Sequence, residues 1–137
     1  MKTYTGGCSC KAIRYEIVAE PLQMAHCQCR DCQESTGSGH ASALVFPKKA
    51  VKLSGNPTYY ATQADSGNTK RRAFCSICGS PLYTLLDAMP DLFALKVGSL
   101  DDPSVFQPQI VLYTDSGQAW DAIDPALPSY PKMPSAV

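Results

Sequence analysis

Cys75-Ser76-Ile77-Cys78-Gly79 and Cys8-Ser9-Cys10 are the two short stretches around which we expect the chain to fold. A C-x-x-C lies on a tight turn whose backbone N–H groups point at the sulfurs, and the glycine that follows can adopt a positive φ. In an extended C-x-C both side chains point to one face, with Cα atoms roughly 6–7 Å apart. Both spacings allow two thiolates to bind one zinc ion at about 2.3 Å. The two stretches therefore predict a closed, structural zinc site formed by Cys8, Cys10, Cys75 and Cys78.

A third cluster, Cys27-Gln28-Cys29-Arg30-Asp31-Cys32, brings the total to seven cysteines. An odd number cannot pair completely as disulfides within the chain, and these short spacings are more typical of metal sites in a reducing compartment. Seven thiolates divide into four, which close a tetrahedral structural site, and three, which leave one position open as in catalytic zinc sites. We therefore expect two zinc ions per chain, the second one catalytic and bound by Cys27, Cys29 and Cys32.

A zinc ribbon would be a different partition of the same ligands. It would combine two C-x-x-C pairs, Cys29 with Cys32 and Cys75 with Cys78. The remaining three cysteines would then form the open set. We prefer the first partition because residues 27–32 can wrap one ion without long-range help, which leaves two whole pairs to join the N-terminus to the middle of the chain.

A histidine could complete the second site and make both ions structural, since sites of three cysteines and one histidine are common. The candidates are His26 and His40. His26 is disfavoured because adjacent residues rarely share an ion. A redox C-x-x-C would need a βαβ context that the sequence lacks, and the spacings match no ferredoxin pattern for an iron–sulfur cluster.

An open zinc site with three thiolates predicts sulfur chemistry. The thiolates satisfy much of the Lewis acidity of the ion, so it should activate water poorly and accept a fourth sulfur readily. A thiol bound there would lose its proton and could attack a small aldehyde to form a hemithioacetal. The competing interpretation is a zinc-stabilised binding module without catalysis, in which the second site is a further staple or a thiol sensor.

Basic residues near the clusters are candidates for holding the carboxylate of a thiol substrate, because arginine can bind a carboxylate through two N–H groups. These candidates are Arg30, Lys48, Lys49, Lys70, Arg71 and Arg72. The competing interpretation for each of them is an ordinary solvated charge.

The bulk composition describes one soluble globular domain over residues 1–137. The 12 basic and 12 acidic residues give a formal net charge of zero, so no global field favours nucleic acid or an anionic membrane. The apolar runs are too short to span a bilayer, and the N-terminus has no apolar signal region. We expect a cytoplasmic protein without nucleic-acid or membrane partners, and a homo-oligomer is compatible with the sequence.

The secondary-structure pattern predicts a mainly β fold. Segments rich in Val, Ile, Leu, Tyr and Thr, separated by Gly and Pro, predict strands at 12–18, 42–46, 51–53, 58–62, 92–97 and 110–113. Short helical turns are expected at 31–36 and 101–105. Four prolines after residue 124 predict an extended C-terminal strap over about 125–137, with Trp120 as its packing anchor.

The succession of motifs resembles the family of the glutathione-dependent formaldehyde-activating enzyme (Gfa) and centromere protein V. The matching parts are residues 6–10, 14–15, 27–32, 36–38, 74–80 and 97–103 and Trp120. The sequence differs from the common family pattern at Lys11, where glycine is frequent, and at Gln28, Gln33 and Gln109, where histidine or a basic residue is frequent.

This resemblance implies an Mss4-like fold of several small coiled β-sheets around a structural zinc. It carries that zinc onto Cys8, Cys10, Cys75 and Cys78, and a catalytic zinc onto Cys27, Cys29 and Cys32. The implied activity is that of S-(hydroxymethyl)glutathione synthase, formally a carbon–sulfur lyase. Its implied small-molecule partners are a thiol such as glutathione and formaldehyde or a related small aldehyde.

Overall fold

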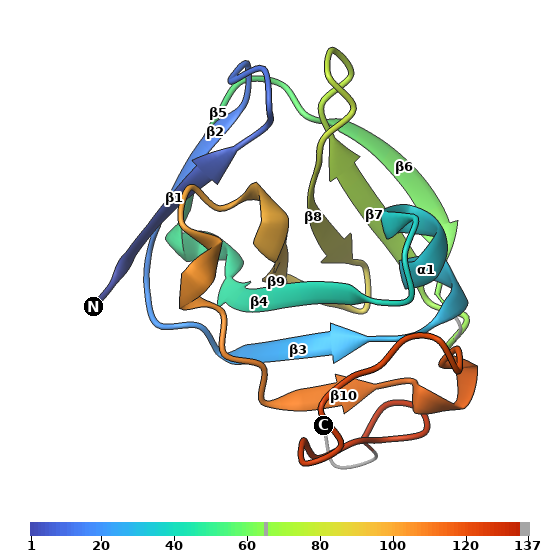
Figure 1. The fold of residues 1–137 in the computed structure, drawn as a ribbon. Coiled ribbons are helices and arrows are strands. Elements are labelled where there is room, and N and C mark those ends of the chain that lie inside the picture. The colour runs from blue at the N-terminus through green and yellow to red at the C-terminus, as the bar shows by residue number, and fades with distance from the viewer. Residues whose placement is uncertain (65, 135–137) are drawn as a thin grey trace.

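The computed structural model describes residues 1–64 and 66–134, and most of its regular structure is β. In these residues the strands form two sheets, and one short helix, α1 (Arg30–Thr36), lies beside them (Figure 1). This arrangement confirms the predicted mainly β class. No helix in the described residues has the length and apolar character needed to cross a membrane.

The larger sheet contains seven strands. Their order is β10 (Ile110–Leu112), β3 (Gln23–Cys27), β4 (Ala41–Pro47), β9 (Met89–Lys96), β8 (Pro81–Leu86), β7 (Thr69–Phe74) and β6 (Thr58–Gln63). Neighbours pair in antiparallel fashion except β10 and β3, which are parallel. Short 3-10 turns lie after three of these strands: η1 (Lys48–Ala50) after β4, η2 (Val97–Ser99) after β9 and η4 (Thr114–Ser116) after β10. A further turn, η3 (Pro103–Val105), lies in the loop between η2 and β10.

The smaller sheet is antiparallel and packs its inner face on the core. Its order is β1 (Thr3–Gly7), β2 (Arg14–Val18) and β5 (Val51–Ser54). Alternating residues such as Tyr15 and Ile17 are buried, in one cluster with Leu44 and Phe46 of β4. This alternation is what a sheet with one buried face requires.

The small sheet is also joined to the loop that follows β9. Gly6 forms an isolated bridge with Leu100, and the Arg14 guanidinium donates to the Asp101 carboxylate through Nη1 at 2.9 Å. A Cβ atom on Gly6 would lie 2.3 Å from the Ser99 carbonyl oxygen. The approach of the two backbones therefore requires glycine here.

All six predicted strands are present, with boundaries that shift by at most a few residues. The predicted helical turns correspond to α1 and to η3. Four further strands, β1, β3, β7 and β8, were not predicted. β7 has the sequence Thr-Lys-Arg-Arg-Ala-Phe, and its charges obscure a strand whose cations pair with carboxylates of α1 and of the β8–β9 turn.

The C-terminal segment runs beside β10 at the edge of the large sheet (Figure 1). The N–H of Val111 donates to the Pro128 carbonyl, and the N–H of Tyr130 donates to the Val111 carbonyl, both at 2.9 Å. The last part of the predicted strap, residues 135–137, lies outside the described residues. Trp120 is 68% exposed, so the prediction that it anchors the strap was wrong.

Candidate metal centres

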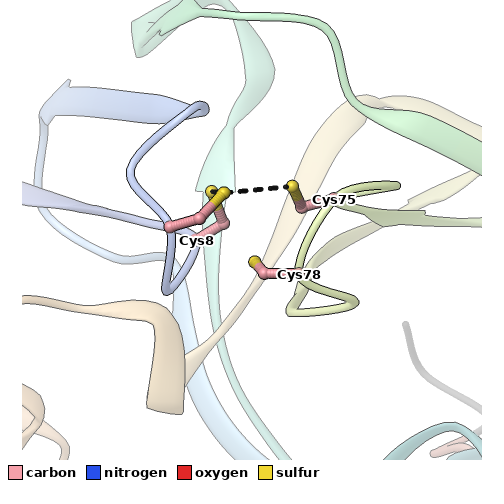
Figure 2. Close-up of side chains that lie close together, drawn as sticks. Cys8, Cys75 and Cys78 are labelled. Atoms are coloured by element: carbon pink, nitrogen blue, oxygen red, sulfur yellow. Dashed lines mark hydrogen bonds between the residues drawn. The ribbon is translucent and has the colours of Figure 1, made fainter.

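Two turns from distant parts of the chain bring four cysteines together. Cys8 and Cys10 lie on the turn between β1 and β2, whereas Cys75 and Cys78 lie on the turn between β7 and β8. All four sulfurs lie within 4.8 Å of one another. Figure 2 shows Cys8, Cys75 and Cys78 pointing into the same space between the two turns.

The sulfur spacing in this four-cysteine cluster fits tetrahedral zinc. Zn–S bonds of about 2.3 Å at tetrahedral angles place two sulfurs roughly 3.8 Å apart. The Cys10 sulfur lies 3.6 Å from that of Cys8 and 3.7 Å from that of Cys75. The residues present therefore fit a zinc ion, and this cluster can hold one.

Backbone and hydroxyl groups stabilise two members of the cluster, Cys8 and Cys78, as thiolates. The N–H of Ile13 donates to the Cys8 sulfur at 3.3 Å. The Ser80 hydroxyl lies 3.2 Å from the Cys78 sulfur, and this hydrogen bond is the first reason that the pKa of Cys78 falls to about 5. A thiol with a lowered pKa is ready to bind metal without a large cost of deprotonation.

The two turns depend on left-handed backbone conformations. Gly79 has φ 78°, as the C-x-x-C-G pattern predicted, and its N–H donates to the Cys75 carbonyl at 2.8 Å. Lys11 has φ 66°, which explains why glycine suits this position in the resembled family. The C-x-C was expected in an extended strand, but Cys8 and Cys10 lie on the hairpin turn instead.

The second cluster is formed by a strand end and the helix that follows it. Cys27 is the last residue of β3, Cys29 is the N-cap of α1, and Cys32 lies in its first turn. Their sulfurs lie within 4.8 Å of one another. The N–H of Cys32 donates to the Cys29 sulfur at 3.3 Å, so one hydrogen bond both caps the helix and holds two donors together. Cys29 and Cys32 are buried, whereas Cys27 is half-buried.

A buried lysine compensates the charge of this three-cysteine cluster. The Lys70 ammonium lies 3.9 Å from the Cys32 sulfur and 2.6 Å from the Asp31 carboxylate. Hydrogen bonds from Cys27 and Cys29 lower the pKa of Cys32 to about 3 against the effect of burial, and Lys70 and Lys96 add positive charge nearby. Cys32 is therefore the thiol of this cluster that ionises most readily, and Lys70 lies where it can balance the negative charge.

Each of the two histidines contacts a polar partner through its Nδ1 atom. His26 Nδ1 lies 2.8 Å from the Ser42 hydroxyl, and His40 Nδ1 lies 2.9 Å from the Asp121 carboxylate. Their rings contact each other edge to face, with ring centres 4.6 Å apart. Among the described residues, neither histidine has a ring nitrogen within 4.8 Å of all three sulfurs of the three-cysteine cluster. The geometry therefore does not place a histidine as its fourth ligand.

The predicted carboxylate-binding cations separate into different environments. Arg71 pairs with Asp87 on an exposed face, and Lys48 and Lys49 lie on the 3-10 turn η1. Arg30 donates to the Gln33 side chain at 2.5 Å, while Arg72 joins Lys70 on Asp31. Of the predicted cations, only Arg30, Lys70 and Arg72 lie beside the three-cysteine cluster.

Two residues near this cluster were not singled out from the sequence. Lys96 ends β9 directly after the apolar run Leu92–Leu95, and a cation at the end of such a run could have drawn attention to it. Tyr113 packs against the cluster in a left-handed conformation at φ 59°. A positive φ in a residue other than glycine is strained and is often found at functional sites, but no pattern in the sequence reveals it.

Comparison with known families decides the affiliation. The family model described as "Glutathione-dependent formaldehyde-activating enzyme" matches residues 3–116. The chain belongs to this family. The match spans both cysteine clusters, so the family's characteristic region includes every sulfur donor described above.

Two individual proteins are similar to this chain at low sequence identity. A curated protein of Halomonas elongata, named "Putative glutathione-dependent formaldehyde-activating enzyme", is 26% identical over 125 residues, which cover 87% of this chain and 80% of that protein. A crystal structure of a Rhodobacter sphaeroides protein matches with a TM-score of 0.56 and 23% identity, over 71% of this chain and 87% of that one. The structural match supports the fold alone.

Proposed function

We propose that this member of the family is a zinc-dependent carbon–sulfur lyase and synthase that joins a small thiol, glutathione, to formaldehyde or a related aldehyde. In the forward direction the thiol sulfur forms a bond to the carbonyl carbon, the C=O π bond opens, and the thiol proton ends on the new hydroxyl. The reaction consumes no oxidant or reductant. It requires reduced cysteines, so we place it in a reducing compartment such as the cytoplasm.

The observation that carries this proposal is the unequal number of sulfur donors in the two clusters. Four thiols converge in one cluster and three in the other. A four-thiolate site is closed and structural, whereas three protein ligands are typical of a zinc site that admits a substrate. We therefore assign Cys8, Cys10, Cys75 and Cys78 to a structural zinc and Cys27, Cys29 and Cys32 to a catalytic zinc.

The protein's own residues prepare the three-cysteine site for a thiol. A zinc ion bound there would supply an open coordination position at which a thiol loses its proton easily. Lys70 offsets part of the negative charge that three thiolates create, so a further anionic sulfur is repelled less. Burial of Cys29 and Cys32 keeps water away from the donors, and this strengthens the electrostatic contribution of Lys70.

Exchange spectroscopy tests the activity despite the spontaneous reaction of thiols with formaldehyde. The rate of exchange between free ¹³C-formaldehyde and its glutathione adduct should rise in proportion to enzyme concentration. Cys29→Ser should return this rate to the uncatalysed value and reduce the zinc content from about two ions per chain to about one. Its far-UV circular dichroism should stay that of the parent, because the four-cysteine cluster is intact.

Cobalt substitution distinguishes catalysis from a purely structural second site. Glutathione should add a sulfur-to-cobalt charge-transfer band in the parent protein and no such band in Cys29→Ser. Unchanged spectra on adding glutathione, together with two ions that resist chelation equally, would support the binding module without catalysis. Global unfolding of Cys29→Ser would contradict the assignment of the two clusters.

A further inference from the structure

Three of the four outer edges of the two sheets are protected by the described part of the chain. The C-terminal segment covers β10 and bonds to both the N–H and the C=O of Val111. The loop after β9 covers part of β1, since the N–H of Asp101 donates to the Thr5 carbonyl at 2.9 Å. The edge strand β5 has only four residues, one of which is Lys52. Coverage, shortness and lysine are the usual means by which proteins prevent an edge strand from pairing with another chain.

The fourth edge is β6, at the end of the large sheet, and it has none of these protections. Figure 1 shows β6 on the outside of the sheet with β7 beside it. Its sequence, Thr-Tyr-Tyr-Ala-Thr-Gln, contains no charged residue and no proline, and five of the six residues are exposed. Within residues 1–64 and 66–134, β7 is the only strand that pairs with it. Such an edge is a template for a further strand.

Alternate residues of β6 direct their backbone groups away from β7. At the turn that joins the two strands, the N–H of Ala64 donates to the Asn68 carbonyl at 2.8 Å. Hydrogen-bonded and non-hydrogen-bonded pairs alternate along an antiparallel ladder, and the register of this hairpin continues from that pair without a shift. The outward N–H and C=O groups are therefore those of Tyr59, Ala61 and Gln63.

These outward groups are complementary to a second copy of themselves. If two β6 strands lie antiparallel with Ala61 on the two-fold axis, Ala61 faces its own counterpart and Tyr59 faces Gln63 of the other copy. Each facing pair can exchange two N–H···O=C hydrogen bonds. Between them, Tyr60 lies beside Thr62 of the other copy, an aromatic and β-branched pair that stabilises neighbouring strands. No like charges meet along the strand, because it has none.

Both tyrosines of β6 are held in place before any such pairing. The Tyr59 hydroxyl is hydrogen-bonded to the Tyr83 hydroxyl, and the Arg72 guanidinium carbon lies 5.7 Å from the centre of the Tyr60 ring. Tyr59 is nevertheless 45% exposed and Tyr60 59% exposed. Large side chains that are already ordered lose little conformational entropy when a partner covers them.

We propose that this protein forms a two-fold dimer through β6, in which the two large sheets join into one continuous sheet. The register around Ala61 favours a second copy over an unrelated extended peptide, because every outward group of the strand finds its match in the same strand. One such edge per chain also makes the contact closed, since a two-fold pairing uses both edges and leaves none for a third chain.

Sedimentation velocity of the zinc-loaded protein over a series of concentrations tests the dimer. A reductant is present throughout, because Cys10 and Cys78 are exposed and disulfides between chains would imitate association. The parent should show a reversible monomer–dimer equilibrium. Ala61→Pro removes an N–H that points away from β7, a position at which an edge strand tolerates proline. It should raise the dimer Kd by at least about tenfold, for two lost hydrogen bonds, with unchanged circular dichroism.

Charge complementation tests the position of the two-fold axis. Ala61→Lys and Ala61→Glu each place like charges opposite one another, so each variant alone should be monomeric where the parent is a dimer. An equimolar mixture of the two should form a heterodimer. Leu22→Lys is the control, because it changes a 60% exposed apolar residue that lies outside β6. It should dimerise like the parent.

Hydrogen exchange locates the contact on the strand. The N–H groups of Tyr59 and Gln63 should exchange slowly in the parent and rapidly in Ala61→Lys. A parent protein that remains monomeric at about 1 mM would overturn the dimer and leave this edge to a foreign strand. A dimer that persists in Ala61→Pro and Ala61→Lys, or that Leu22→Lys dissociates equally, would overturn the assignment to β6.

Discussion

At the scale of single residues, the turn that carries Cys75 and Cys78 depends on the backbone of Gly79. Its φ of 78° lies in the left-handed region, where a Cβ atom is strained even if space is available. Space is available, because a Cβ atom at Gly79 would meet no atom within 4 Å. Any cost of a substitution here therefore reports backbone strain rather than packing.

Gly79→Ala should lower the free energy of unfolding of the zinc-loaded protein by about 1–2 kcal/mol, the cost of a left-handed conformation for a residue with a Cβ atom. Thermal and urea unfolding measure this change. Gly98→Ala is the control, because Gly98 also has open space around its Cβ position but no left-handed φ. Equal stability of the two variants would show that the φ of Gly79 carries no strain.

At the scale of elements, β10 is held at the edge of the sheet by β3 on one side and by the C-terminal segment on the other. The turn after β10 contains Tyr113, which packs against the three-cysteine cluster. The N–H of Thr114 in this turn donates to the Tyr130 carbonyl at 3.0 Å. The C-terminal segment therefore supports one wall of the proposed catalytic site.

Tyr130→Pro should destabilise this edge, because proline has no N–H to donate to the Val111 carbonyl. We expect a loss of about 1 kcal/mol in the free energy of unfolding. Hydrogen exchange should become faster at Val111 and Thr114. Tyr130→Ala keeps the N–H and serves as the control, so exchange rates that rise equally in both variants would assign the effect to the side chain instead.

At the scale of the whole molecule, the four-cysteine cluster joins two hairpins that lie far apart in the sequence. Cys8 and Cys10 belong to the small sheet's first hairpin, whereas Cys75 and Cys78 follow a strand of the large sheet. A metal ion here would connect the two sheets. The three-cysteine cluster spans only the end of β3 and the start of α1, so its metal would add little to the global fold.

Stepwise chelation should therefore remove metal in two stages with different structural consequences. Loss of the first ion, from the three-cysteine cluster, should leave the far-UV circular dichroism and the cooperativity of unfolding unchanged. Loss of the second should unfold the protein, because structural zinc contributes on the order of 10 kcal/mol of apparent binding energy. Metal content and circular dichroism, recorded on the same samples, measure both stages.

Cys75→Ser removes one ligand of the four-cysteine cluster, and it should yield little folded protein. Cys29→Ser removes one ligand of the three-cysteine cluster, and it should remain folded. A soluble Cys75→Ser protein with the parent's melting temperature would show that the structural and catalytic roles of the two clusters have been exchanged.

Several strands were predictable because their residues are typical of a half-buried, pleated surface. β4 and β9, for example, are rich in apolar and branched side chains. β7 was not predictable, because a strand with Lys70, Arg71 and Arg72 resembles a solvated segment. Its cations become compatible with the fold only when Asp31 of α1 and Asp87 after β8 lie opposite them.

The sequence by itself determined that the cysteines have the spacing of metal ligands and, through its segments of branched and aromatic residues, that the chain is mainly β. Local spacing suffices for the metal ligands because two ligands within three residues of each other can reach one ion whatever the rest of the chain does. Only the tertiary structure decided which cysteine pairs converge, that His26 and His40 contact Ser42 and Asp121, and that Arg30 and Arg72 line one cavity. These relations join residues far apart in sequence, so they depend on sheet register and strand order, which no local pattern encodes.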